Sequence, residues 1–145
     1  MSVIVTLDLR IYGVNSVTSL LGLLKECGWS WHNSEGKVEY IPLYDADGSD
    51  WQTKIMKDSE LFELVNQKEA LGEKIGIRFF TRENIGVTFH ASDVHMIGFM
   101  LSNNRVKLKD EYIIGVTDVN WYIKNIVWKL IGQGVRIESI EYSEY

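Results

Sequence analysis

Alternation of apolar and polar side chains over residues 74–116 constrains the fold more than any other feature of this sequence. Ile75, Ile77 and Phe79 fall on one face of an extended chain, and residues 85–90 repeat the pattern. The link between the two runs is short and polar, as in a tight antiparallel turn. The pattern therefore predicts a β-hairpin at the centre of the fold.

A second hairpin is expected directly after the first one. Residues 95–101 are mostly apolar, two Asn residues follow at a position where hairpin turns need a left-handed backbone, and residues 106–109 alternate again. Residues 112–116 are apolar enough to form a further strand that is buried on both faces. Because turns rather than helices join these runs, this part of the sheet should be antiparallel.

The remaining segments alternate between helix and strand patterns. A Ser at position 16 and a Gly at position 28 are typical of the two ends of a helix, and the only proline, at position 42, favours a sheet edge. The predicted elements are a strand over 3–11, a helix over 17–27, a hairpin over 29–44, one bent helix or two over 55–71, a helix from 117 or 118 to 132, and a strand, which a bulge would interrupt, over 135–142.

This order of elements predicts an α+β fold. We expect a mainly antiparallel sheet of about six to eight strands with three helices packed mostly on one face. Residues 1–145 contain no linker-like composition, so a single globular domain is expected.

The composition argues against several classes of protein. A formal net charge of −5 and a pI of about 5.2 disfavour binding to nucleic acid. No apolar run approaches the roughly 20 residues that span a bilayer, and the first residues lack a signal-peptide pattern, so a cytoplasmic protein without a membrane partner is expected. Cys27 is the only cysteine, which excludes an internal disulfide and favours a small buried side chain. The oligomeric state stays open.

The loop over 44–51 carries three carboxylates, Asp45, Asp47 and Asp50. One interpretation is turn chemistry, with Asp50 capping a following helix; a second is an acidic surface for a protein partner; a third is a hard-cation site. An EF-hand that starts at Asp45 would need glycine and glutamate where Asp50 and Met56 stand, so the first interpretation is favoured and no metal is expected.

His90, Asp93 and His95 form the most enzyme-like cluster, and His32 is a conceivable third imidazole. The interpretation favoured here is turn residues with ordinary histidines. The sequence contains no nucleophile elbow, glycine-rich phosphate loop or zinc-protease motif. We therefore expect no catalytic residues and no cofactor, and keep a small enzyme or a metal- or ligand-binding protein that uses His90, Asp93 and His95 as the alternative.

Aromatic and acidic residues suggest a surface for a macromolecular partner. Trp121 and Trp128 lie seven positions apart on a helix stripe that also carries polar residues, so they either overlie the sheet rim or form an interface. The last residues mix carboxylates with tyrosines, which suits either a solvated tail or a contact with a basic surface. The candidate partner-binding residues are Asp45, Asp47, Asp50, Trp51, Glu60, Glu63, Trp121, Trp128, Glu141, Tyr142, Glu144 and Tyr145.

With acidic stretches at 45–50 and 138–144 and no catalytic signature, the chain resembles the small acidic immunity proteins of bacterial contact-dependent growth inhibition and other polymorphic toxin systems. The resemblance is one of type, without a diagnostic motif. It implies an inhibitor that binds a cognate toxin domain, often a basic nuclease, and occludes its active site.

Overall fold

The computed structural model describes residues 3–45 and 48–145. Its strands and helices follow one another in an order close to the predicted one. The elements are β1 (Val5–Tyr12), α1 (Val17–Glu26), β2 (Val38–Tyr40), β3 (Gln52–Lys54), α2 (Asp58–Leu71), β4 (Ile75–Phe80), β5 (Gly86–Asp93), β6 (Met96–Asn103), α3 (Val119–Tyr122), a π-helical turn (Ile123–Val127), α4 (Trp128–Gly132) and β7 (Arg136–Glu144).

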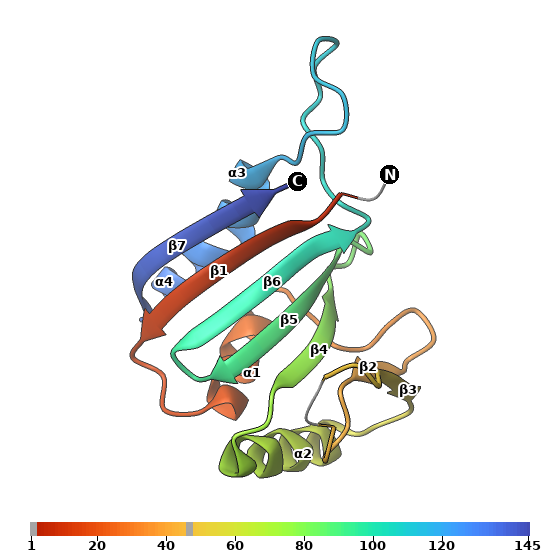
Figure 1. Cartoon of the computed structure of the whole chain (residues 1–145), viewed down its shortest axis with the longest axis vertical. Helices are drawn as coiled ribbons and strands as arrows, with labels where there is room; N and C mark the ends of the chain where they lie inside the picture. The colour runs from red at the N-terminus through yellow and green to blue at the C-terminus, as the bar shows by residue number, and fades with distance from the viewer. Residues whose placement is uncertain (1–2, 46–47) are drawn as a thin grey trace.

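The strands form one seven-stranded sheet in the order β3-β2-β4-β5-β6-β1-β7, and every neighbouring pair is antiparallel (Figure 1). The predicted central hairpin is β4-β5, in which Ile77 lies opposite Phe89. The first and last predicted strands lie side by side as β1 and β7, and a bulge shifts their register between Arg10 and Ile11. The predicted α+β class is therefore confirmed, with the imperfect alternation of the last strand explained by the bulge.

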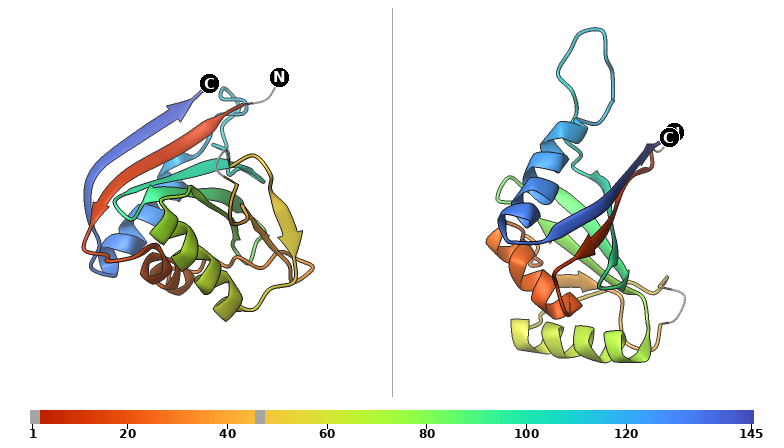
Figure 2. Two further views of the ribbon diagram at one scale, coloured as in Figure 1. Left: turned by 60° about the horizontal axis from the view of Figure 1, so that its bottom comes forward. Right: turned by 90° about the vertical axis from the view of Figure 1, so that its left-hand side faces the viewer.

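The helices pack mainly on one face of the sheet (Figure 2). The odd-numbered residues of β1 from Val5 to Ile11 point to this face and are buried, whereas the residues between them lie on the other face. Leu20, Leu21 and Leu24 of α1 are also fully buried, because helical spacing places them on one side. The core thus lies between the helices and this face.

Capping side chains set the N-terminal ends of two helices. The Ser16 hydroxyl accepts a hydrogen bond from the backbone N–H of Ser19 and caps α1, as predicted. Asp118 caps the last helix in the same way through Trp121. That helix runs continuously through α3, the π-helical turn and α4; the extra residue of a π-turn rotates the residues that follow it. Trp128, the first residue of α4, is left on the exposed side.

The predicted helix over 55–71 begins later than expected. Residues 52–54 form the edge strand β3, Ile55 is 77% exposed, and α2 starts at Asp58. The expectation that Asp50 caps a helix was therefore wrong, because a strand follows it. Sequence periodicity failed here because β3 has three residues, too few to show a repeat.

The predicted second hairpin was also wrong. β6 continues to Asn103 and pairs with β5 and β1, so residues 106–109 do not return along it. Residues 104–118 instead leave the sheet as a long loop, here called the arm, which projects from the end of the molecule (Figure 1). The strand expected over 112–116 lies in this arm and is not buried.

Within residues 3–45 and 48–145, no helix combines the length and the apolar character needed to cross a membrane.

Candidate partner-binding surface

The root of the arm is tied to the body by a network of hydrogen bonds. Nη1 of Arg105 donates to the carbonyl oxygen of Gly115 at 2.7 Å and to the hydroxyl oxygen of Thr117 at 2.6 Å. The same guanidinium forms an ion pair with Glu144 of β7 at 3.6 Å. The backbone N–H of Val106 donates to the hydroxyl oxygen of Tyr122 in α3 at 2.9 Å. These contacts fix the direction in which the arm leaves the sheet.

The tip of the arm displays apolar side chains to solvent. Tyr112 is 88% exposed and Ile114 is 93% exposed. Single bridges, Lys107 with Thr117 and Asp110 with Ile113, hold the two halves of the arm together. Exposing a large apolar side chain forgoes about 1.5–3 kcal/mol of burial free energy. A projecting, rooted tip of this composition is therefore suited to entering a recess on a partner.

One carboxylate of the last strand, Glu144, also supports the root of the arm. The hydroxyl of Tyr142 donates to Glu144, whose other oxygen accepts the backbone N–H of Thr117 at 3.3 Å. Burial and the hydrogen bond to Glu144 raise the pKa of Tyr142 to about 12. Burial alone would raise the pKa of Glu144, but hydrogen bonds from Tyr142 and Thr117 and the charge of Arg105 lower it. Glu144 is therefore a charged anchor of the arm.

The helix side of the sheet carries a shallow apolar groove along the N-terminal half of β7. β7 is the edge strand, and the groove lies between it and the last helix, with a volume of about 400 Å³. Trp128, Ile131 and Ile140 line it and are all exposed, Trp128 by 61%. At its C-terminal end β7 reaches the root of the arm, where Glu144 pairs with Arg105, whereas the groove lies along its N-terminal half. The β7 edge thus links the two, and we call the arm, this groove and the β7 edge together the arm-side surface.

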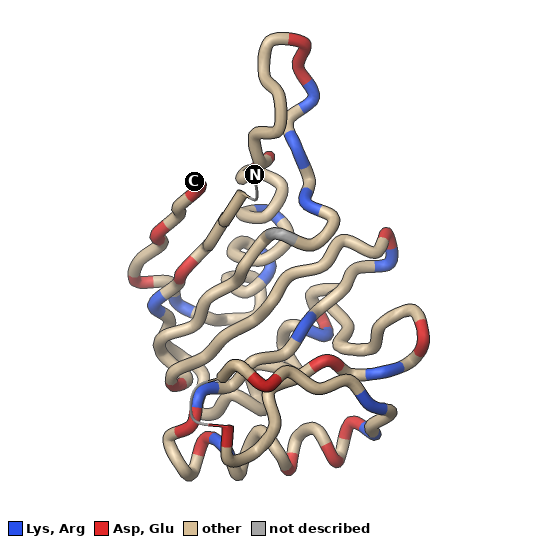
Figure 3. Tube along the Cα trace, turned by 45° about the vertical axis from the view of Figure 1, so that its right-hand side comes forward, with Lys and Arg blue, Asp and Glu red and all other residues tan. Residues whose placement is uncertain are grey.

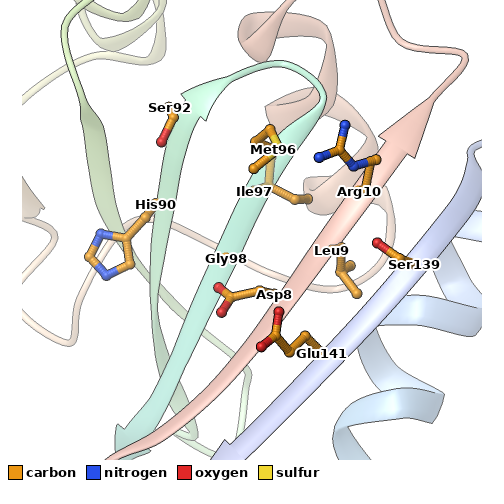
Figure 4. A pocket seen from close by; sticks show the side chains of 10 residues that line it. All are labelled: Asp8, Leu9, Arg10, His90, Ser92, Met96, Ile97, Gly98, Ser139 and Glu141. Atoms are coloured by element: carbon orange, nitrogen blue, oxygen red, sulfur yellow. The ribbon is translucent and has the colours of Figure 1, made fainter.

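Two carboxylates face each other on the open side of the sheet, the side away from the helices. Asp8 of β1 lies opposite Glu141 of β7, and both line a hollow of about 300 Å³ (Figure 4). Burial, and then the charge of Glu141, raise the pKa of Asp8. Among the residues that the structure describes, neither carboxylate forms an ion pair. Like charges directly opposite each other are destabilising in a sheet, so a cation placed here would be favoured.

The structure separates the candidate residues that the sequence grouped together. Trp128, Glu141, Tyr142, Glu144 and Tyr145 lie at the β7 side of the sheet. Glu60 and Glu63 are exposed on α2, which contacts β4 and α1 on the other half of the fold. Figure 3 shows acidic positions on both halves. Two separate acidic surfaces therefore exist.

The acidic loop lies at the α2 side. Asp45 accepts the backbone N–H of Asp50 at 2.7 Å, so its carboxylate organises the loop, while Asp50 itself is exposed. Trp51 is partly buried over the open face, where its ring lies 5.5 Å from the Arg78 guanidinium. Asp47 lies outside the described residues.

Trp121 does not match Trp128 in exposure. Its ring packs edge-on against Trp29 at 6.2 Å and against Tyr122 at 4.9 Å, and it is partly buried. The π-helical turn between the two tryptophans separates their environments. Of this pair, only Trp128 offers a largely free ring.

The histidine cluster is not assembled. Asp93 accepts the backbone N–H groups of His95 and Met96, as a turn residue does, and Nδ1 of His95 lies 3.0 Å from the carbonyl oxygen of Ile11. The His90 ring lies near Trp51 instead, and burial, followed by the charge of Lys74, lowers its pKa to about 4. His32 contacts the carbonyl oxygen of Met56. Over the described ranges, no three His, Cys, Asp or Glu residues form a metal-binding group.

Sequence reasoning missed the arm itself. Tyr112 and Ile114 carry the signal of a buried strand, and only the four charged residues among 107–111 beside them indicate solvent. Cys27, by contrast, is buried as predicted, and burial raises the pKa of its thiol.

No protein-family model matches the chain, no curated protein matches it in sequence, and no solved structure matches it significantly.

Proposed function

We propose that this chain is a binding protein that neutralises a partner by occlusion, in the manner of an immunity protein against a bacterial toxin domain. The observation that carries the proposal is the arm, with Tyr112 and Ile114 exposed at its tip. The protein acts by contact in this proposal and performs no chemistry on the partner.

The fixed base of the arm supports an inhibitory role. Arg105, Thr117 and Glu144 hold the base, so less conformational entropy is lost when the tip docks. A tip that projects from the body can reach into a concave site that a flat surface cannot fill. Occlusion of an active site is the outcome that such a shape favours.

Charge supports a basic partner. The chain carries a net charge of −5, and the arm-side surface includes Glu138 and Glu141, both exposed. Complementary charge speeds association and disfavours acidic competitors. A toxin domain with a basic active-site cleft, such as a nuclease, fits these requirements, and the protein would meet it in the cytoplasm.

The test is co-expression with the product of the neighbouring gene, which the proposal expects to be a toxin, followed by calorimetry on the purified pair. We expect the chain to restore growth and to bind the domain directly. The double substitution Tyr112→Ser with Ile114→Ser should weaken binding by about 1000-fold, since aromatic and apolar anchors contribute about 2 kcal/mol each at an interface.

A matched control is available because Tyr44 and Ile55 are 81% and 77% exposed and lie away from the arm. Replacing both with Ser makes the same chemical change and should leave affinity within about twofold. Equal affinity of the arm variant and the control, or growth rescue without any complex, would contradict the proposal.

A further inference from the structure

The outer edge of β7 presents unpaired backbone groups. Ile4 and Tyr145 exchange two backbone hydrogen bonds, of 2.8 and 3.0 Å, which fixes the alternation along β1 and β7. In an antiparallel ladder, every second residue then points its N–H and C=O away from the neighbouring strand. By this count Ile140 and Tyr142 direct their backbone groups outward. Within the described chain, no further strand lies beyond β7.

A strand added at this edge would lie over the apolar groove. Ile140 lies opposite Leu9, a buried residue of β1, so its side chain is on the helix side of the sheet. Trp128 and Ile131 flank it there. An apolar side chain placed opposite Ile140 would therefore contact these two exposed residues and bury them.

The other face of the same edge is acidic. Glu141 points to the open side, beside Asp8, and no ion pair neutralises either one in the part of the chain that the structure describes. A residue opposite Glu141 in an added strand has its Cβ about 4.5–5.5 Å away, within reach of both carboxylates. A Lys or Arg at that position would be favoured.

We propose that the β7 edge binds an extended segment of a basic partner protein by strand addition. The segment alternates an apolar residue, which packs on Trp128 and Ile131, with a basic residue, which pairs with Glu141 and Asp8. Main-chain hydrogen bonds provide affinity and the alternating side chains provide specificity. The inference rests on the proposed function and adds the secondary structure and sequence pattern of the bound segment.

A second copy of the chain fits this edge less well. Antiparallel pairing of two β7 strands centred on Glu141 would place Glu141 beside its own copy and Glu138 beside Glu144. Two molecules of net charge −5 also repel each other at a distance. The charges of the edge thus act against self-pairing while they attract a basic strand.

The experiment uses the ¹⁵N-labelled full chain and a capped seven-residue peptide that alternates lysine with valine. We expect the peptide to shift the amide signals of Ile140 and Tyr142, and a glutamate-valine peptide of the same length to leave them unchanged. Glu141→Lys should weaken the lysine-valine peptide by at least tenfold. Glu63→Lys, an equal change of charge on α2, should alter it by less than twofold.

A backbone test separates strand addition from simple charge attraction. Ile140→Pro removes an outward N–H that bonds to no other strand, so the ladder with β1 keeps its hydrogen bonds. This variant should keep the dispersion of the wild-type spectrum and lose peptide binding. Ile140→Ala, which shortens the side chain and keeps the N–H, should retain binding in part.

Several results would overturn the proposal. The first two are amide signals of β7 that do not shift, and shifts that spread over α2 and the loop at 48–51. The others are equal binding of both peptides, and a dimer that forms without peptide in sedimentation and that Ile140→Pro dissociates. The readout is confined to β7 amides and does not involve the tip of the arm. A failure here therefore leaves the result of the Tyr112 and Ile114 substitutions interpretable by itself.

Discussion

Lys68 shows how a single residue can depart from what its type predicts. It is fully buried in α2, where its ammonium donates to the carbonyl oxygen of Pro42 at 2.7 Å and to Glu73 at 3.1 Å. Glu73 in turn accepts the backbone N–H of Tyr44. This charged group thereby joins α2 to the loop before the acidic stretch.

Lys68→Ala should lower the free energy of unfolding by about 3 kcal/mol or more, because it leaves Glu73 without its buried partner. Urea denaturation followed by circular dichroism measures the change. Lys124→Ala, at an exposed position of the last helix, should stay within about 0.5 kcal/mol of wild type. If both variants lost the same free energy of unfolding, the buried pair of Lys68 and Glu73 would contribute no specific stabilisation.

His90 makes the stability of the protein depend on pH. Its pKa is about 4 in the folded chain, below the ordinary value of 6.5. Between these two pH values the unfolded chain binds the proton and the folded chain does not, so the free energy of unfolding falls as the pH falls. Below a pH of about 4 both states bind the proton, and the effect of His90 levels off. His90→Gln should flatten the dependence of the urea midpoint on pH between 4 and 6.5. An unchanged slope in the variant would refute the assignment to His90.

At the residue scale, the sequence predicts the core better than the polar exceptions. Ile75, Ile77 and Phe79 are buried as alternation requires, since the side-chain period of a strand depends only on backbone geometry. The burial of Lys68 depends on a carbonyl and a carboxylate that tertiary structure brings to it. No local pattern carries that information.

At the scale of elements, the arm depends on its root. Leu108 and Asp118 donate their N–H groups across the arm to Val116 and Val106, each at 2.9 Å. Arg105 spans the same base and pairs with Glu144. The arm should therefore loosen as a unit when this side chain is shortened.

Arg105→Ala should speed hydrogen exchange at the amides of Leu108 and Asp118 by about tenfold, the equivalent of about 1.4 kcal/mol. Amides of β4 and β5 should exchange at the wild-type rate, because these strands lie elsewhere in the sheet. Faster exchange throughout the chain would instead mean that Arg105 supports global stability, and unchanged exchange at Leu108 would mean that the root is held without it.

The arm also shows where element prediction fails. Apolar side chains at 112–116 predict a buried strand, because burial is the usual reason for such a run. Sequence alone does not state whether the covering surface belongs to the same chain. In this fold that surface is absent from the described residues, and Tyr112 and Ile114 stay in water.

At the scale of the whole molecule, strand order decides which predicted residues act together. β1 separates β6 from β7, so the first and last strands meet and bring Asp8 beside Glu141. The loop at Asp45 and the helix carrying Glu63 belong to the other half of the sheet. Composition predicted acidic and aromatic surfaces, but this long-range pairing, which no short pattern encodes, divides them into two.

Hydrogen exchange of the full chain, measured with and without the product of the neighbouring gene, shows which surface recognises the partner. Our proposal is that the arm-side surface does so, rather than the acidic loop. We expect slowed exchange over 104–118 and 136–144, with the segments at 48–54 and 58–71 unchanged. Protection confined to 48–54 and 58–71, with the arm exchanging as freely as before, would contradict the account.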